Sequence, residues 1–173
     1  MRRQFSKPKV FALGIAAASL VLAGCAATVG SETSTASYDD EAIRIEAALV
    51  SEITVFRSPT CGCCGKWIEH AEAAGFQVKD EVTEDMSAIK QTYGVPQSLT
   101  SCHTTVVGDY VVEGHIPAED VQRLLTEKPD IAGIAVPGMP IGSPGMESGD
   151  YTEPYTVFSF NESGETSAFS EHS

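Results

Sequence analysis

Residues 53–64 read ITVFRSPTCGCC, and this stretch decides the fold that the sequence predicts. Its first four residues are β-prone, and the Ser-Pro-Thr that follows them is typical of a turn. Beyond the cysteines, apolar residues recur at helical spacing until Gly75 ends the pattern: Trp67, Ile68, Ala71 and Ala74. The sequence therefore predicts a strand, a turn and a helix, with Cys61, Cys63 and Cys64 at the corner where the helix begins.

The segments that follow extend this unit in a regular order. The pattern predicts a strand at 76–82, a helix at 86–93, a hairpin at 104–114 and a third helix after Pro117. The resulting order of β, α, β, α, β, β and α, with cysteines at the first strand-to-helix corner, is that of thioredoxin. We therefore predict an α/β fold in the form of a thioredoxin-like three-layer domain.

This domain is predicted to occupy residues 52–160. Within it, residues 131–153 are rich in Gly, Pro and Met and are predicted to form a long loop, followed by an edge strand at 155–160. Loops of this length are uncommon unless they are functional, so we expect this one to cover the site. Residues 161–173 are mostly polar and are expected to form a frayed tail.

The first 25 residues resemble a lipoprotein signal. Basic residues precede an uncharged apolar run from Val10 to Gly24, which is too short to span a bilayer comfortably. The run ends in Leu-Ala-Gly-Cys, similar to the lipobox of bacterial lipoproteins, in which the cysteine is acylated. We expect residues 1–24 to be a signal peptide and Cys25 to carry a lipid anchor. Because Ala26 follows rather than Asp, the pattern resembles that of outer-membrane lipoproteins that face the periplasm.

Residues 25–51 are predicted to connect the anchor to the domain. Small and hydroxyl side chains dominate up to about Tyr38 and cannot bury enough surface to fold, so we interpret this part as a flexible tether. The acidic residues 39–41 then precede apolar residues at helical spacing, which predicts a short lead-in helix.

The chain is strongly acidic. Its 173 residues include 11 Lys and Arg against 24 Asp and Glu, a net charge of −13. Four of the basic residues lie in the first nine positions, so removal of the signal peptide leaves 7 basic and 24 acidic residues, a net charge of −17. Such a surface repels phosphate backbones and anionic headgroups, which argues against a nucleic-acid-binding protein and against a polybasic peripheral membrane protein. The expected partners are cationic or neutral molecules and metal ions.

Four cysteines remain for the domain once Cys25 is assigned to the lipid anchor. Cys102, followed by His103, stands just before the third predicted strand, in a loop that packs beside the first helix of a thioredoxin fold. The four thiols and this imidazole form a soft, sulfur-rich site that suits Cu(I), with Zn(II) as the less favoured ion. The adjacent Cys63 and Cys64 should point in different directions, so we expect bridging thiolates and more than one Cu(I).

Several motifs stand out together: Cys61-Gly62-Cys63-Cys64 with Trp67, Ser101-Cys102-His103-Thr104, Gly114-His115-Ile116-Pro117, and the stretches 135–140 and 142–147, each with one Pro-Gly-Met triplet. In combination they resemble the periplasmic CopG-type proteins of copper-resistance loci, a thioredoxin-like metal-binding family. The similarity covers about residues 54–147. It implies copper binding through the cysteines and a role in copper handling or redox cycling in the cell envelope, with other envelope copper-handling proteins as partners.

Further candidate ligands surround this cysteine set. His103 is predicted to support Cys102 as a ligand or as a donor close to the metal. His115 is equally compatible with a ligand and with a structural turn residue. Met139 and Met146 carry soft thioethers suited to Cu(I) capture, although we favour the alternative that they fill gaps beneath the loop.

Three other residues are predicted to take no part in the site. His70 lies two turns along the predicted helix from Cys63, about 10 Å at 1.5 Å per residue, and is expected on the surface. His172 is expected to be inert in the tail. Trp67 is expected to pack in the core.

The leading interpretation is a membrane-tethered envelope protein that binds copper for sequestration, transfer or redox cycling. The alternative is an enzyme, a thiol-disulfide oxidoreductase with Cys61 as attacking thiol and Cys64 as resolving thiol, and with Cys63 and Cys102 as a second pair. A purely structural disulfide or zinc staple is disfavoured, because a chain of this length buries a core without one.

Overall fold

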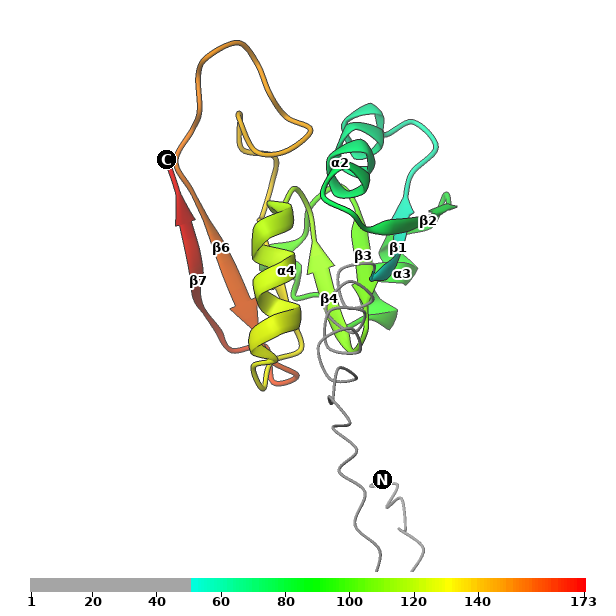
Figure 1. Cartoon of the computed structure of the whole chain (residues 1–173). Coiled ribbons are helices and arrows are strands. Elements are labelled where there is room, and N and C mark those ends of the chain that lie inside the picture. The colour runs from blue at the N-terminus through cyan, green and yellow to red at the C-terminus, as the bar shows by residue number, and fades with distance from the viewer. Residues whose placement is uncertain (1–50) are drawn as a thin grey trace, which may run out of the picture. The chain divides into compact units, whose positions relative to one another are not determined.

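A computed structural model of the chain describes residues 51–173 (Figure 1). These residues form a mixed α/β fold with a seven-stranded sheet of order β2-β1-β3-β4-β5-β6-β7, which confirms the α/β part of the predicted fold. The expected signal peptide, lipid anchor, tether and lead-in helix lie outside the described residues, apart from residue 51. None of the helices in 51–173 has the length and apolar character that crossing a bilayer requires.

The elements follow the predicted order as far as the third helix. The strands are β1 (Glu52–Arg57), β2 (Gln77–Val82), β3 (Thr104–Val107), β4 (Tyr110–Glu113), β5 (Gly133–Ala135), β6 (Tyr155–Phe160) and β7 (Thr166–His172). The helices are α2 (Gly62–Ala73), α3 (Met86–Thr92), the short 3-10 helix η1 (Gln97–Leu99) and α4 (Ala118–Glu127). The pairs β1–β2 and β4–β5 are parallel, and the remaining neighbours are antiparallel.

Alternation along the strands produces a buried cluster on each face of the sheet. Neighbouring residues of β4, Val111 and Val112, belong to different clusters, and so do Ile134 and Ala135 of β5. The helices α2 and α4 supply the first cluster with Trp67, Ala71, Val121 and Leu124. Burying each large apolar side chain contributes about 1.5–3 kcal/mol, so the two faces together hold the sheet between its covering layers.

Trp67 belongs to this core, as predicted, and is 1% exposed. Its indole N–H donates to the carbonyl of Ile116 at 2.8 Å. The bond ties the first turns of α2 to the segment that carries His115, so the core residue also connects two parts of the candidate site.

The prediction of an unbroken loop over residues 131–153 is wrong at its start, because Gly133–Ala135 form β5. Three residues are too few to show the alternation by which strands are recognised. The informative residue is Gly133, where a Cβ atom would lie 2.1 Å from the carbonyl oxygen of Val111. Only glycine lets β5 pair with β4 at this distance.

The frayed tail expected from residue 161 is also wrong, because Thr166–His172 form β7. A turn at Asn161–Gly164 reverses the chain: Asn161 Oδ1 accepts bonds from the backbone N–H of Ser163 and of Glu165, both at 3.0 Å. The strand predicted at 155–160 is confirmed as β6, but β7 is the edge strand in its place. The sequence feature that indicates this hairpin is the turn motif at Asn161–Gly164, which stands between two short β-prone runs.

Candidate metal centre

The cysteine cluster lies where the sequence places it, between β1 and α2. Cys61 is the N-cap residue of α2, with extended φ and ψ of −82° and 93°, and its N–H donates to the carbonyl of Ser58 at 3.2 Å. Cys63 and Cys64 lie in the first turn of the helix, where backbone N–H groups have no partner within the helix. This end of the helix carries a partial positive charge that favours thiolates.

The sulfur atoms of this corner gather around Cys63. Cys61 and Cys64 form a disulfide, whereas Cys63 and Cys102 are free and partly buried. Cys63 Sγ lies 3.5 Å from Cys61 Sγ and 3.8 Å from Cys102 Sγ. The Sγ atoms of Cys61, Cys63 and Cys102 all lie within 4.8 Å of one another, close enough to hold one metal ion. Cys64 is fully buried beneath this group.

Cys102 differs from the helical cysteines because it approaches from the loop before β3. Burial, together with the neighbouring Cys63, raises the pKa of the Cys102 thiol to about 12, and Lys90 opposes the shift. A thiol with so high a pKa stays protonated at neutral pH, so binding of a metal cation by its sulfur releases a proton.

Two fully buried histidines lie close to each other, and one of them, His103, follows Cys102 in the chain. Both ring nitrogens of His103 lack a hydrogen-bond partner, and so does Nε2 of His115. The His103 ring lies 4.7 Å from the Trp67 ring and 5.0 Å from the His115 ring, measured between centroids. Burial is the main cause that lowers the pKa of both, that of His103 to well below 6.5. Both imidazoles are therefore neutral near pH 7, the form in which histidine binds metals.

The loop after β5 is anchored to both halves of the centre. On one side, His115 Nδ1 and the carbonyl of Pro144 are 2.8 Å apart. On the other, Ser101 Oγ donates to the carbonyl of Gly138. A Cβ atom at Gly145 would lie 2.8 Å from the carbonyl oxygen of Cys63, so the loop backbone packs directly on the first turn of α2.

The two methionines of this loop differ in exposure. Met139 follows the Ser101 contact and is 52% exposed, whereas Met146 is partly buried. Met139 is thus one of the few large apolar side chains of residues 51–173 that remain in solvent.

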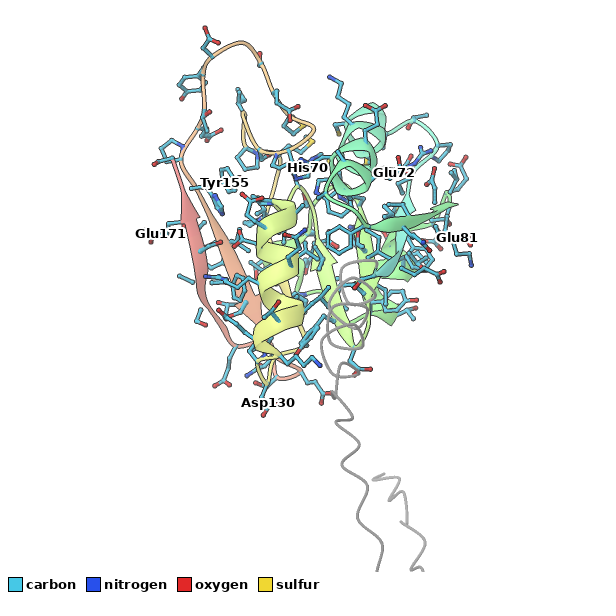
Figure 2. All side chains as sticks on the ribbon, in the orientation of Figure 1. His70, Glu72, Glu81, Asp130, Tyr155 and Glu171 are labelled. Atoms are coloured by element: carbon cyan, nitrogen blue, oxygen red, sulfur yellow. A yellow bond between two sulfur atoms is a disulfide. The ribbon has the colours of Figure 1, made fainter. Side chains whose placement is uncertain are left out.

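His70 and His172, expected to be uninvolved, both have structural roles. His70 is only partly exposed, and its Nε2 accepts the backbone N–H of Ala118 at 3.0 Å. It therefore lies between α2 and the start of α4 and satisfies one of the free N–H groups there (Figure 2). His172 Nε2 lies 2.7 Å from Asp120 Oδ2 and joins β7 to α4.

The sequence analysis missed an ion pair beside the centre. Glu113 of β4 is fully buried and meets Lys90 of α3 at 2.5 Å. Its signal was present in the sequence, because a carboxylate stands in the otherwise apolar run Tyr110-Val111-Val112 and buried carboxylates are rare unless paired.

The donor set fits a soft metal ion. Three sulfur atoms meet in one partly buried group, those of Cys61, Cys63 and Cys102, whereas Cys64 and the buried imidazoles of His103 and His115 do not belong to that group. Thiolates and imidazoles bind Cu(I) and Zn(II), whereas ions such as Mg²⁺ prefer oxygen ligands and would bind weakly to this set of donors. The fold and the site define a class of protein with a sulfur-rich candidate metal centre at a strand-to-helix corner.

Comparison with known proteins narrows this class. A family described as "Protein of unknown function, DUF411" matches residues 99–146. Two solved structures, titled Copper resistance protein copG, Form 2 and Form 1, are 50% identical to the chain. Form 2 has a TM-score of 0.69 and matches 72% of this chain and 99% of its own, and Form 1 has a TM-score of 0.68 and matches 71% and 98%. A search of curated proteins found no match.

The chain therefore belongs to the CopG copper-resistance family. This confirms the resemblance that the cysteine, histidine and Pro-Gly-Met motifs suggested.

Proposed function

We propose that this protein is a thioredoxin-like lipoprotein of the cell envelope that binds Cu(I) in a thiolate cluster. Cys61, Cys63, Cys64 and Cys102 are the ligands, and His103 supports them. In this proposal Cys25 anchors the chain to the outer membrane, facing the periplasm, and copper is cargo that is sequestered, passed on or changed in oxidation state.

One observation carries the proposal: the sulfur atoms of Cys61, Cys63 and Cys102 lie within 4.8 Å of one another. In support, His103 follows Cys102 in the chain and has two buried ring nitrogens without a partner. A buried polar group without a partner costs about 1–3 kcal/mol, which a bound cation would offset. The two 50% identical structures are named copper resistance proteins, which supports copper as the metal.

The disulfide adds a condition to this proposal. Two of the four sulfur atoms are paired with each other in the Cys61–Cys64 bond and cannot bind as thiolates. A thiol reductant that supplies two electrons and two protons converts this bond into two thiols. We therefore expect full copper capacity in the reduced protein alone.

The test is an anaerobic titration of the reduced full-length chain, carrying Cys25→Ser and solubilised in a mild detergent. Bound Cu(I) and free thiols are read together, with Zn(II) titrated separately. We expect more than one Cu(I) per chain with all four thiols protected, and fewer Cu(I) when Cys63→Ser is added. Weak binding that leaves the thiols free would overturn the proposal.

The disulfide itself favours a second candidate function, thiol-disulfide exchange. Cys61 is partly exposed and Cys64 is fully buried, as an attacking and a resolving thiol should be. An insulin-reduction assay separates the two functions. An oxidoreductase should keep most of its rate in Cys63→Ser and lose it in Cys61→Ser, whereas a copper carrier should show no appreciable rate in either.

A further inference from the structure

The buried carboxylate of Glu113 has three polar contacts. Two of them are to residues on either side of Cys102 and His103, and the third is to Lys90, which neutralises the charge of Glu113. Oε1 accepts the backbone N–H of Ser101 at 2.6 Å and the ammonium of Lys90 at 2.5 Å. Oε2 accepts the hydroxyl of Thr104 at 2.7 Å. The Glu113 side chain thus holds both ends of the four-residue segment that carries Cys102 and His103.

This segment has few other restraints. Ser101 forms an isolated bridge with Gly138, and the next regular pairing begins only at Thr104, where β3 starts. Between them, the carbonyl of His103 accepts the N–H of Gly114 at 3.0 Å. The backbone that carries Cys102 is therefore held by these bonds and by the side chain of Glu113, which contacts both ends of the segment.

Lys90 makes this arrangement possible. Its side chain is 14% exposed, and its ammonium also donates to Thr104 Oγ1 at 3.2 Å. An unpaired buried carboxylate would be strongly unfavourable, whereas a buried ion pair is about as stable as an apolar pair of similar size. Stability alone therefore does not explain why the pair is present. The pair is explained if the two carboxylate oxygens of Glu113 are needed as acceptors at fixed positions.

We propose that Glu113, neutralised by Lys90, is a positioning residue that holds the Cys102 thiol against Cys63. The Sγ atoms of these two cysteines are 3.8 Å apart, although the residues are 39 positions apart in sequence. Only the expected effect of Glu113 on Cu(I) binding rests on the proposed function, because the approach of Cys102 to Cys63 is measurable without metal.

The first test therefore measures that approach alone. In the full-length chain with Cys25→Ser, Cys61→Ser and Cys64→Ser, diamide oxidises the two remaining thiols. Cys63 and Cys102 lose two electrons and two protons to diamide and form one disulfide. Glu113→Gln keeps the shape of the side chain but removes its charge and one acceptor, and should slow this reaction by about tenfold, as small misplacements of reacting groups do.

Two further variants separate positioning from stability. Asp120→Asn is the matched control, because Asp120 is also a buried carboxylate with two close partners, Ser170 and His172, on a different part of the fold. It should leave the rate unchanged. The double variant Lys90→Met with Glu113→Leu replaces the pair by apolar side chains, and should keep the fold by near-UV circular dichroism while the reaction stays slow. A rate equal to the parent's in a folded Glu113 variant would overturn the proposal.

The second test adds copper to the chain with all four site cysteines. Glu113→Gln should weaken Cu(I) binding by about 10–100-fold, the usual effect of losing a group that orients a ligand, while Asp120→Asn binds as the parent does. If the parent itself binds no Cu(I), the proposed function fails and the cross-linking rates still decide the positioning role. Slowed cross-linking with unchanged Cu(I) affinity would remove Cys102 from the ligand set and leave its positioning by Glu113 established.

Discussion

Two polar clusters of this protein differ in how completely their hydrogen bonds are made. In the C-terminal cluster, Asp120 is 5% exposed and accepts bonds from Ser170 at 2.6 Å and from His172 at 2.7 Å. The His172 ring also stacks on Tyr155, with centroids 4.9 Å apart, in the hairpin of β6 and β7. In the metal centre, His103 is fully buried and neither of its nitrogens has a partner.

The difference lies in whether a buried polar side chain has a hydrogen-bond partner within the protein. Of the unpartnered buried side-chain atoms in the described chain, three belong to His103 and His115, and the remaining two to Thr105 and Arg123. Arg123 is only an apparent exception, because another of its nitrogens donates to the carbonyl of Phe169 at 2.8 Å. The polar side chains of the C-terminal cluster bond to one another, whereas three imidazole nitrogens near the candidate metal centre have no partner in the protein.

The largest effect on this comparison is expected from Gly145→Val. A Cβ atom at this position would lie 2.8 Å from the carbonyl oxygen of Cys63 and 2.9 Å from the backbone nitrogen of Trp67, at φ of +84°. Because neither backbone group moves easily, the variant should lose about 3 kcal/mol in free energy of unfolding and release the loop from His115. Urea denaturation followed by circular dichroism measures the loss.

The matched control is Gly164→Val in the turn of the C-terminal hairpin. Its φ of +80° is similar, but no atom lies within 4 Å of the added Cβ, so only the backbone strain of about 1–2 kcal/mol remains. Equal losses in the two variants would show that contact between the loop and α2 contributes nothing to stability.

Replacing one histidine of each cluster by leucine is expected to change the free energy of unfolding in opposite directions. His103→Leu removes an unpartnered buried imidazole and should raise the free energy of unfolding by about 1–3 kcal/mol, while Cu(I) binding weakens. His172→Leu removes a bond to a carboxylate and should lower the free energy of unfolding by about 1–2 kcal/mol, with Cu(I) binding unchanged. Both are read by urea denaturation without metal and by Cu(I) titration. A stability loss in His103→Leu would indicate that this imidazole serves the fold as His172 does.

The sequence predicted best those features that depend on local spacing. The corner at Cys61, the helices beginning near Met86 and Ala118 and the hairpin of β3 and β4 all follow from periodicity and turn residues close together in the chain. β5 escaped prediction because its stability comes from pairing with β4 and β6, which are distant in sequence. β7 pairs with β6, its neighbour in the chain, and was missed because its mostly polar residues were interpreted as a tail.

The same distinction applies to the site. Cys102 and His103 were expected beside the helix because a known chain order implies that packing, and the structure places them there. The roles of Lys90, Glu113 and His70 depend on side-chain contacts between residues 9 to 48 positions apart, for which the sequence holds no spacing rule. Glu113 alone left a local sign, as a charge within an apolar strand.

The smallest expected effect is a loss of stability in mild acid, which we attribute to His103 and His115 near the candidate metal centre. Burial lowers the pKa of His103 and of His115 in the folded protein below 6.5, so the unfolded chain takes up these protons first as the pH falls. The unfolded state then binds more protons than the folded state, and the free energy of unfolding falls with pH below about 6.5, by at most about 1.4 kcal/mol per pH unit for each histidine. Glu147 and Glu165, whose pKa values lie below 4.5, add their losses only in stronger acid. Urea denaturation between pH 5 and 7 should therefore show a free energy of unfolding that falls as the pH falls, and His103→Leu should reduce this slope by up to the contribution of one histidine, about 1.4 kcal/mol per pH unit. An unchanged slope in that variant would mean that His103 is protonated equally in the folded and unfolded states.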